Sequence, residues 1–332
     1  MVNYIIRRLI ISVFVLFAIA AISFFIIQLP PGDYASTYKQ FLIQTANLTE
    51  DKAEEMTQLV RKQYGLDQPV YVQFFTWIKG IVTEGKFGYS FAYRKDAGEI
   101  ILDRLPKTMM LALLAHAVST LVGLAAGIYV GPRQYGWADN ILSFIAFILT
   151  SIPRFFIALV IMYTLVFVFG QHHVTSFYSP EFAVAPWSWG KFLDLAKHVW
   201  PVILIAGLGG VSRNMRVMRA NLLDVLNAQY VTTARAKGLT ERRVMNRHAV
   251  PNAMHAIIGY QGTVLPYMIQ GEIEAAIVMG IPSLGPILLT ALRSQDIYLS
   301  GGALLVTAAL IVFGNLLADI FLAVLDPRIR YS

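Results

Sequence analysis

The ionisable residues that interrupt the apolar stretches of this chain are the first candidates for chemistry. They are Arg154, Glu272, Glu274 and Asp319. Because an ionisable group at the centre of a bilayer costs about 2.5–3.5 kcal/mol, each should face protein or a water-filled cavity. Asp319 follows Asn315 by four residues, on the same helix face, which favours structural pairing.

Glu272 and Glu274 are two residues apart, so they cannot share one face of a helix. Two alternatives stay open. One of the pair lines a polar pathway while the other pairs internally, with Arg154 as the suggested partner. Otherwise both serve structural pairing or lie at an interface between subunits.

A basic insert, "TTARAKGLTERRVMNRHAVPNA" at residues 232–253, is the second candidate. Residues 231–237 form a short helix candidate that contains Ala and Thr. Gly238 is suited to the left-handed backbone conformation of the residue that ends such a helix. Thr240 is then a predicted N-cap, with Glu241 favourably placed at the positive end of a second helix.

The second helix is expected to end before Pro251. Helix, glycine and helix would together expose Arg235, Lys237, Arg242, Arg243 and Arg247. An amphipathic helix lying on the membrane is the simpler interpretation. Its apolar face would be small and scattered, so we favour a docking element for another protein.

Three further arginines, Arg213, Arg216 and Arg219, recur every third residue just before this insert. They fall roughly on one helix face, from which long side chains can reach lipid headgroups. We therefore assign them to membrane anchoring, with lipid as their partner.

Motifs for enzymatic chemistry are absent from the sequence. It has no cysteine, so thiol catalysis and cysteine-ligated metal sites are excluded. It contains no phosphate-binding G-x-x-x-x-G-K-[ST], no H-E-x-x-H and no G-x-S-x-G. We expect no enzyme, no metal site and no cofactor bound by this chain.

Composition indicates an integral membrane protein. Of 332 residues, 56% are hydrophobic and only 14% are charged, with a mean hydropathy of +0.58. A spanning helix needs about 20 mainly apolar residues. Six segments qualify, the third of them kinked near Pro153 and the fourth continuing toward Met218: 9–29, 108–130, 141–170, 199–212, 257–280 and 301–325.

The charge distribution predicts the orientation. Residues 30–107 hold ten basic and ten acidic side chains, whereas 213–255 holds eight basic and two acidic ones. Arg7 and Arg8, and Arg328 and Arg330, add positive charge near the two ends. By the positive-inside rule both termini and 213–255 are cytoplasmic. This explains the net charge of +7 without a nucleic-acid partner.

The expected fold is therefore an all-α membrane protein of six transmembrane helices in three parts. Residues 1–30 form an N-terminal anchor helix, which is too long for a cleaved signal peptide. Residues 31–107 form an extracytoplasmic helical subdomain, with one helix between Thr49 and Gly65 and another starting near Pro69. Residues 108–332 form a five-helix core with the cytoplasmic loop 213–255.

The basic insert resembles the cytoplasmic signature of permease subunits of binding-protein-dependent ABC importers, E-A-A-x-x-x-G-x9-I-x-L-P. Ala234, Gly238 and Pro251 match it, while Thr232 and Thr233 stand at its first two positions. "ARAKGL" and "HAVPNA" are similar to the variant in the oligopeptide, dipeptide and nickel permease family. So are "YIIRRL", "PPGDY", "YGLDQPVYVQFF", "GKFGYS", "RLPKT" and "NLLADIFLAVLDPRIRY", in the expected order.

The resemblance implies a type I ABC importer permease of the first-permease ("B") type, in the bacterial cytoplasmic membrane. Its implied partners are a second homologous permease subunit, two ABC ATPase subunits that carry ATP and Mg, and an extracytoplasmic solute-binding protein. The implied ATPase-coupling residues are Thr232, Thr233, Ala234, Arg235, Ala236, Lys237, Gly238, Leu239, Arg242 and Pro251.

The cargo stays open at this point. Relatives that read E-x-x-F-x-x-P-G-L-G in the fifth span have a glutamate where this chain has Ala276. A peptide is expected, with an oligosaccharide or opine as alternatives, because a fold does not fix a cargo. A proton-coupled transporter that uses Glu272, Glu274 and Asp319 is the alternative class.

Overall fold

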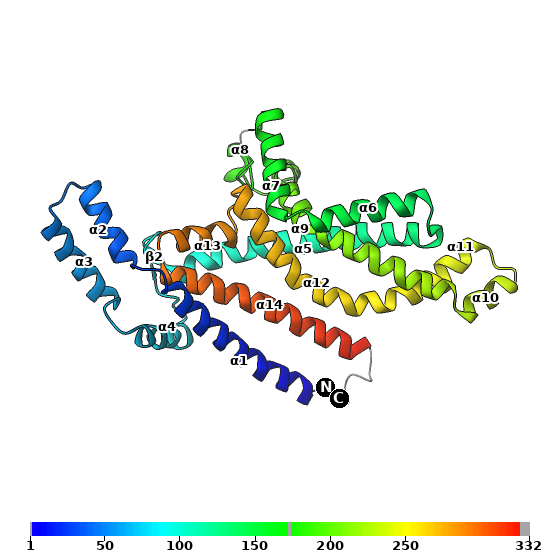
Figure 1. The fold of residues 1–332 in the computed structure, drawn as a ribbon, viewed down its shortest axis with the longest axis horizontal. Helices are drawn as coiled ribbons and strands as arrows, with labels where there is room; N and C mark the ends of the chain where they lie inside the picture. The colour runs from blue at the N-terminus through cyan, green and yellow to red at the C-terminus, as the bar shows by residue number, and fades with distance from the viewer. Residues whose placement is uncertain (1, 172–173, 326–332) are drawn as a thin grey trace. The chain divides into compact units, whose positions relative to one another are not determined.

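The computed structural model describes residues 2–171 and 174–325, and helices dominate this part of the chain (Figure 1). One antiparallel hairpin lies between α4 and α5, with Tyr89 opposite Asp96 and Ser90 opposite Lys95. In chain order the elements are α1 (Val2–Ile27), α2 (Tyr34–Gln44), α3 (Glu50–Tyr64), α4 (Val70–Glu84), β1 (Tyr89–Ser90), β2 (Lys95–Asp96), α5 (Ala97–Val130), a 3₁₀ turn (Gly131–Arg133), α6 (Trp137–Ser151), α7 (Arg154–Tyr163), a π turn (Thr164–Val168), α8 (Pro180–Ala183), α9 (Trp189–Leu226), α10 (Gln229–Ala236), α11 (Glu241–Val244), a second π turn (Met245–Ala249), α12 (Val250–Met279), α13 (Leu284–Arg293) and α14 (Ile297–Leu325).

Four helices in the described part are long and apolar enough to cross a membrane. Two pairs of helices, each bent at a short break, raise the count to six when each pair is taken as one span. The expected kink in the third span is confirmed, because α6 and the helix that starts at Arg154 are bent by 97° about Pro153. Arg328 and Arg330 lie outside the described residues.

The fourth span is longer than its apolar core suggests. α9 begins at Trp189, where the side chain of Ser188 accepts a hydrogen bond from the Lys191 N–H and so caps the helix. The fourth span was expected to start at residue 199, so α9 begins ten residues earlier than predicted. At the other end α9 continues to Leu226, past the expected Met218.

The chain divides into two compact units. The first consists mainly of Thr108–Ile281 and the second of Arg7–Lys107 with Pro282–Leu310. In the first unit α9 runs beside both α5 and α12 (Figure 1).

Three glycines explain the close contact of α5 with α9. A Cβ on Gly123 would lie 2.6 Å from the Asn214 Cβ, and one on Gly127 would lie 2.6 Å from the Met218 Cβ. Gly131, the first residue of the 3₁₀ turn that follows α5, would meet Leu222 in the same way, at 2.8 Å. Small residues at every fourth position let two membrane helices approach closely, so this face of α5 is shaped for α9.

The second unit confirms the two helices expected in 31–107. α3 follows Thr49 and ends at Gly65, whose φ is +67°, and α4 follows Pro69. Thr49 makes no side-chain capping bond, although its backbone is extended as an N-cap requires. The fully buried Asp296, just before α14, accepts hydrogen bonds from the Ser90 hydroxyl and the Ala92 N–H and so holds the hairpin in place.

Candidate functional site

The turn after α10 has the geometry expected at Gly238. Its φ of +75° lies in the left-handed region, and its N–H donates to Arg235 O at 2.9 Å. The Leu239 N–H reaches back to Ala234 O at 3.4 Å. These two bonds form a Schellman motif, which ends a helix and turns the chain sharply. Leu239 is half-buried because this motif places it against the helix that it ends.

Residues 229–249, called the basic turn below, have a small core of their own. Val231, Ala234 and Val244 are buried together and pack against Val225 at the end of α9. The buried pair on α10 is three residues apart, so the opposite face of this helix points outward. The exposed residues of the basic turn include Thr232, Thr233, Arg235, Ala236, Lys237, Gly238 and Arg242.

One of the expected docking charges already has a partner. Arg235 Nε donates to Glu241 Oε1 at 2.8 Å, across the turn at Gly238. Glu241 therefore pairs with Arg235 in addition to standing at the start of α11. Thr240 makes no side-chain capping bond. Lys237 and Arg242 are exposed and form no ion pair with any described residue.

The expected end of the second helix before Pro251 is wrong. α11, the π turn and α12 follow one another without a break, and Pro251 is the second residue of α12. Proline has no N–H to donate to the preceding turn. The wider π turn, in which the Val250 N–H reaches Met245 O, accommodates this position and keeps the helical path continuous.

The two glutamates of the fifth span lie in different surroundings. Glu272 is completely buried, whereas the side chain of Glu274 is 41% exposed. Glu274 Oε2 lies 3.6 Å from Arg154 Nη1, which gives the suggested arginine an acidic partner. Arg154 is the first residue of α7, directly after the break in the third span.

The surroundings of Arg154 include two residues that the sequence did not single out for such a site. Its guanidinium carbon lies 4.0 Å from the ring centre of Tyr267 on α12. The guanidinium carbon of Arg213, on α9, lies 5.6 Å from the same ring centre. Arg213 was expected to reach lipid headgroups instead. No spacing signal connects these residues, because three different helices bring them together.

Arg219 does not behave as an anchoring arginine either. Its Nε and Nη2 donate to the two carboxylate oxygens of Asp139, each at 2.6 Å. Asp139 is only 2% exposed. Of the three arginines, Arg213 and Arg216 are exposed, while Arg219 connects α9 to α6.

A row of amides also crosses the first unit. The Thr120 hydroxyl donates to Gln261 Oε1 at 2.9 Å, Gln261 Nε2 donates to Asn214 Oδ1 at 3.0 Å, and Asn214 Nδ2 donates to Ser119 O at 3.3 Å. Hydrogen bonds between membrane helices hold α5, α9 and α12 together. Asp319 lies half-buried on α14.

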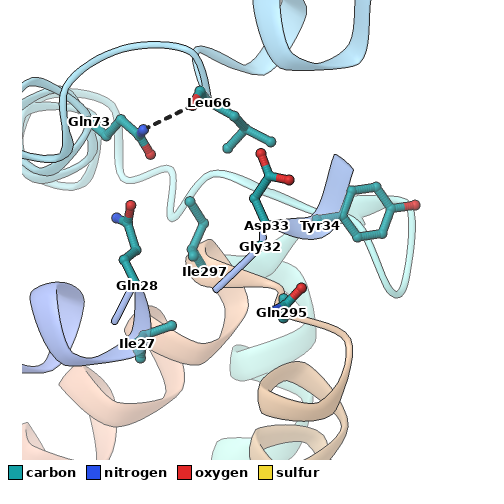
Figure 2. Close-up of a pocket in the computed structure, with 9 residues that line it drawn as sticks. All are labelled: Ile27, Gln28, Gly32, Asp33, Tyr34, Leu66, Gln73, Gln295 and Ile297. Atoms are coloured by element: carbon teal, nitrogen blue, oxygen red, sulfur yellow. Dashed lines mark hydrogen bonds between the residues drawn. The ribbon is translucent and has the colours of Figure 1, made fainter. Parts of the chain in front are cut away.

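The second unit holds a polar pocket of about 60 Å³ beside the end of α1. Gln28 and Gln73 point toward this space, while Gln73 also donates to Leu66 O (Figure 2). Gln28 Nε2 and Gln73 Oε1 are buried and have no hydrogen-bond partner among the described residues. The pocket has room for a few water molecules, which makes it too small for a peptide.

Comparison with known proteins places the whole chain in one family. Residues 123–331 match the binding-protein-dependent transport system inner membrane component, and residues 1–112 match the N-terminal part of such membrane components. The chain is 30% identical to the oligopeptide transport system permease protein AppB of Bacillus subtilis and 31% identical to a putative peptide permease protein of Brucella ovis. Both alignments cover 100% of each sequence. A probable peptide ABC transporter permease protein of Sinorhizobium fredii is 29% identical over 99% of each.

The chain therefore belongs to the family of inner membrane components of binding-protein-dependent transport systems. It has the type I ABC permease fold and is a multi-pass membrane protein that serves as a transport subunit rather than an enzyme. Its class works with ATPase subunits and a solute-binding protein. The alternative of a proton-coupled transporter has no support. Among the described residues, no group of acidic and histidine side chains is arranged to hold a metal ion.

Proposed function

We propose that this chain forms one half of the membrane channel of an ATP-driven peptide importer, with cargo delivered by an extracytoplasmic binding protein. The observation that supports a peptide cargo most is the similarity over the full length to several peptide permeases. Oligosaccharides and opines remain the alternative cargoes, because pathway residues rather than the fold select the solute.

The complete importer in this proposal contains a second, homologous permease subunit and two ATPase subunits, which bind ATP and Mg. The present chain binds no cofactor. Both its termini and the loop 213–255 are cytoplasmic, the subdomain 31–107 is extracytoplasmic, and 108–332 is the permease core with 1–30 as anchor. The excess of basic residues in 213–255 supports this orientation.

The basic turn is the proposed coupling element. Buried Val231, Ala234 and Val244 fix α10 to the end of α9. The outer face of the basic turn can then press against an ATPase through the seven exposed residues given above. Leu239 and Pro251 support the turn. ATP binding would favour one of two states of the channel, and the turn would transmit that preference to α9 and α12.

Arg154, Glu272 and Glu274 are the proposed pathway residues. The partial exposure of Glu274 supports its place on the pathway, since exposure of a carboxylate to lipid within a span has a high free-energy cost. The complete burial of Glu272 supports a role inside the helix bundle.

The test of the coupling role is Gly238→Val. A β-branched residue is strained at a φ of +75°, while no atom lies within 4 Å of a Cβ there, so the change distorts the turn without a clash. Gly65→Val is the matched control, because Gly65 has a φ of +67° and equally open surroundings outside the basic turn.

Uptake by the reconstituted importer and the yield of copurified ATPase should be measured for both variants. We expect Gly238→Val to abolish uptake while inserting normally, and Gly65→Val to retain it. Normal uptake by a stable Gly238→Val complex contradicts the coupling role. Mass spectrometry of the native complex would identify the partner subunits and their ratio.

A further inference from the structure

The ring of Tyr267 lies within reach of two guanidinium groups, Arg154 at 4.0 Å and Arg213 at 5.6 Å. These three residues are called the arginine cluster below. Both distances are within the range of a cation–π contact. Glu274 is the acidic side chain that forms an ion pair with the cluster among the described residues. Arg154 and Arg213 thus bring two positive charges to the ring of Tyr267.

Two glycines make room for the arginine cluster. A Cβ on Gly271 would lie 2.9 Å from Arg154 Nη1, and a Cβ on Gly209 would lie 2.9 Å from the Tyr267 hydroxyl oxygen. Any larger residue at either position would displace the polar group that now lies there. The backbone of α9 and α12 is thus shaped around the cluster.

Arg154 has hydrogen-bonding capacity that the described chain does not use. Its Nη2 is buried and has no hydrogen-bond partner among the described residues. The contact with Glu274, at 3.6 Å, is too long for a hydrogen bond. A buried donor without an acceptor destabilises a protein, so the site favours an acceptor that comes from elsewhere.

The cluster is also accessible from one side. Arg213 is exposed near the proposed cytoplasmic end of the fourth span, and Glu274 is 41% exposed within the fifth span. Charged groups at such depth face water or another protein rather than lipid. That side therefore faces either the translocation pathway or the second permease subunit.

We propose that the arginine cluster binds a carboxylate of the cargo as the cargo crosses the membrane. The planar guanidinium of Arg154 matches a carboxylate geometrically, and Arg213 adds the second positive charge. A C-terminal carboxylate is common to all peptides, so its recognition suits a carrier of varied sequences. This inference rests on the proposed function, because it takes the cargo to be a peptide.

The test uses the complete importer in proteoliposomes, with its binding protein loaded to saturation so that binding-protein affinity does not enter the rate. Three peptides are compared: one with a free C-terminus, the same peptide amidated, and the amidated peptide with an acidic side chain. The variants are Arg154→Gln and Arg213→Gln. Arg216→Gln is the control, because Arg216 is an exposed arginine of the same helix with no ring contact among the described residues.

We expect the wild type to transport the free acid about tenfold faster than the amide, the effect of one charge-assisted hydrogen bond. Both cluster variants should bring this ratio close to one, whereas Arg216→Gln should keep it. Faster uptake of the acidic amidated peptide than of the plain amide would show that a side-chain carboxylate also serves. If Arg154→Gln fails to assemble, the exposed Arg213→Gln variant gives the decisive ratio.

A wild type that does not distinguish acid from amide overturns the carboxylate site, and so does a ratio unchanged in the assembled cluster variants. A wild-type complex that hydrolyses ATP but takes up none of the three peptides contradicts the peptide cargo itself. The two failures are therefore distinguishable.

Discussion

Arg219 on α9 donates two hydrogen bonds of 2.6 Å to Asp139 on α6, although 80 residues separate them in the sequence. Asp139 also accepts the Tyr135 N–H at 2.9 Å, so the same carboxylate orders the turn before α6. The pair fixes the end of α9 from which the basic turn extends. A contact of this kind keeps α6 and α9 together.

Arg219→Gln should destabilise the first unit by about 3–5 kcal/mol, because it leaves a buried carboxylate without its counter-charge. Thermal unfolding of the detergent-solubilised importer would measure this, with Arg216→Gln as the control on the exposed face. The double variant Arg219→Met, Asp139→Asn should recover much of the loss. A single variant as stable as the control would show that the pair contributes nothing.

Gly127→Val should separate α5 from α9. The new Cβ would lie 2.7 Å from Met215 O, a backbone atom that cannot rotate away. Overpacking of this kind costs about 1–3 kcal/mol. Ala125→Val is the matched control, since Ala125 is exposed two residues earlier. Equal thermal midpoints for the two variants would contradict the proposed packing role of the glycines.

Arg242→Glu should weaken the association of the ATPase subunits by about tenfold, the effect of about 1.4 kcal/mol. Arg242 is exposed and has no ion pair with a described residue, so its charge is available to a partner. Glu241→Gln, which removes an exposed pair within the turn, should have little effect. Binding of the ATPase subunits, measured at rising salt concentrations, would distinguish the two variants. Equal losses of affinity in both variants would exclude charge complementarity at Arg242.

Arg61→Gln should change the acid stability of the second unit. Burial alone would raise the pKa of Asp33, but hydrogen bonds from Arg61 and Ser36 outweigh it and leave the pKa below its usual value of 3.8. The folded carboxylate thus loses its proton at lower pH than the unfolded one. The resulting stability is fully present above 3.8 and is lost as pH falls through the lowered pKa.

The variant should therefore be less stable by about 1.5 kcal/mol at neutral pH and should lose less on acidification. Limited proteolysis of residues 31–107, carried out from neutral to acidic pH, would measure this change in stability. Lys62→Gln is the control, because Lys62 is exposed and forms no ion pair with a described residue. Parallel pH curves for Arg61→Gln and the wild type would mean that Asp33 does not titrate against Arg61.

The sequence predicted those features that depend on local chemistry. Apolar length identified the spans, Pro153 identified the break in the third, and Gly238 identified the left-handed turn. Ser188 was an available N-cap signal for α9 that the prediction did not use. The spacing of Gly123 and Gly127 was likewise readable as a helix-packing motif.

The remaining features depend on tertiary contacts. The partner of Arg219 could not be predicted, because packing of α6 on α9 selects Asp139 from many acidic residues. The approach of Arg213 to Tyr267 has the same origin. Pro251 misled the prediction because a π turn, which has no sequence rule, replaces the expected end of the helix.

The unbroken path through Pro251 has a mechanical consequence. From Val250 to Tyr267, α12 rises by about 26 Å at about 1.5 Å per residue, and no loop interrupts it. The basic turn therefore adjoins one end of this stretch of α12, and Tyr267 of the arginine cluster lies at its other end. Because a helix resists compression far better than a loop does, a displacement at Val250 would be transmitted to Tyr267 with little loss.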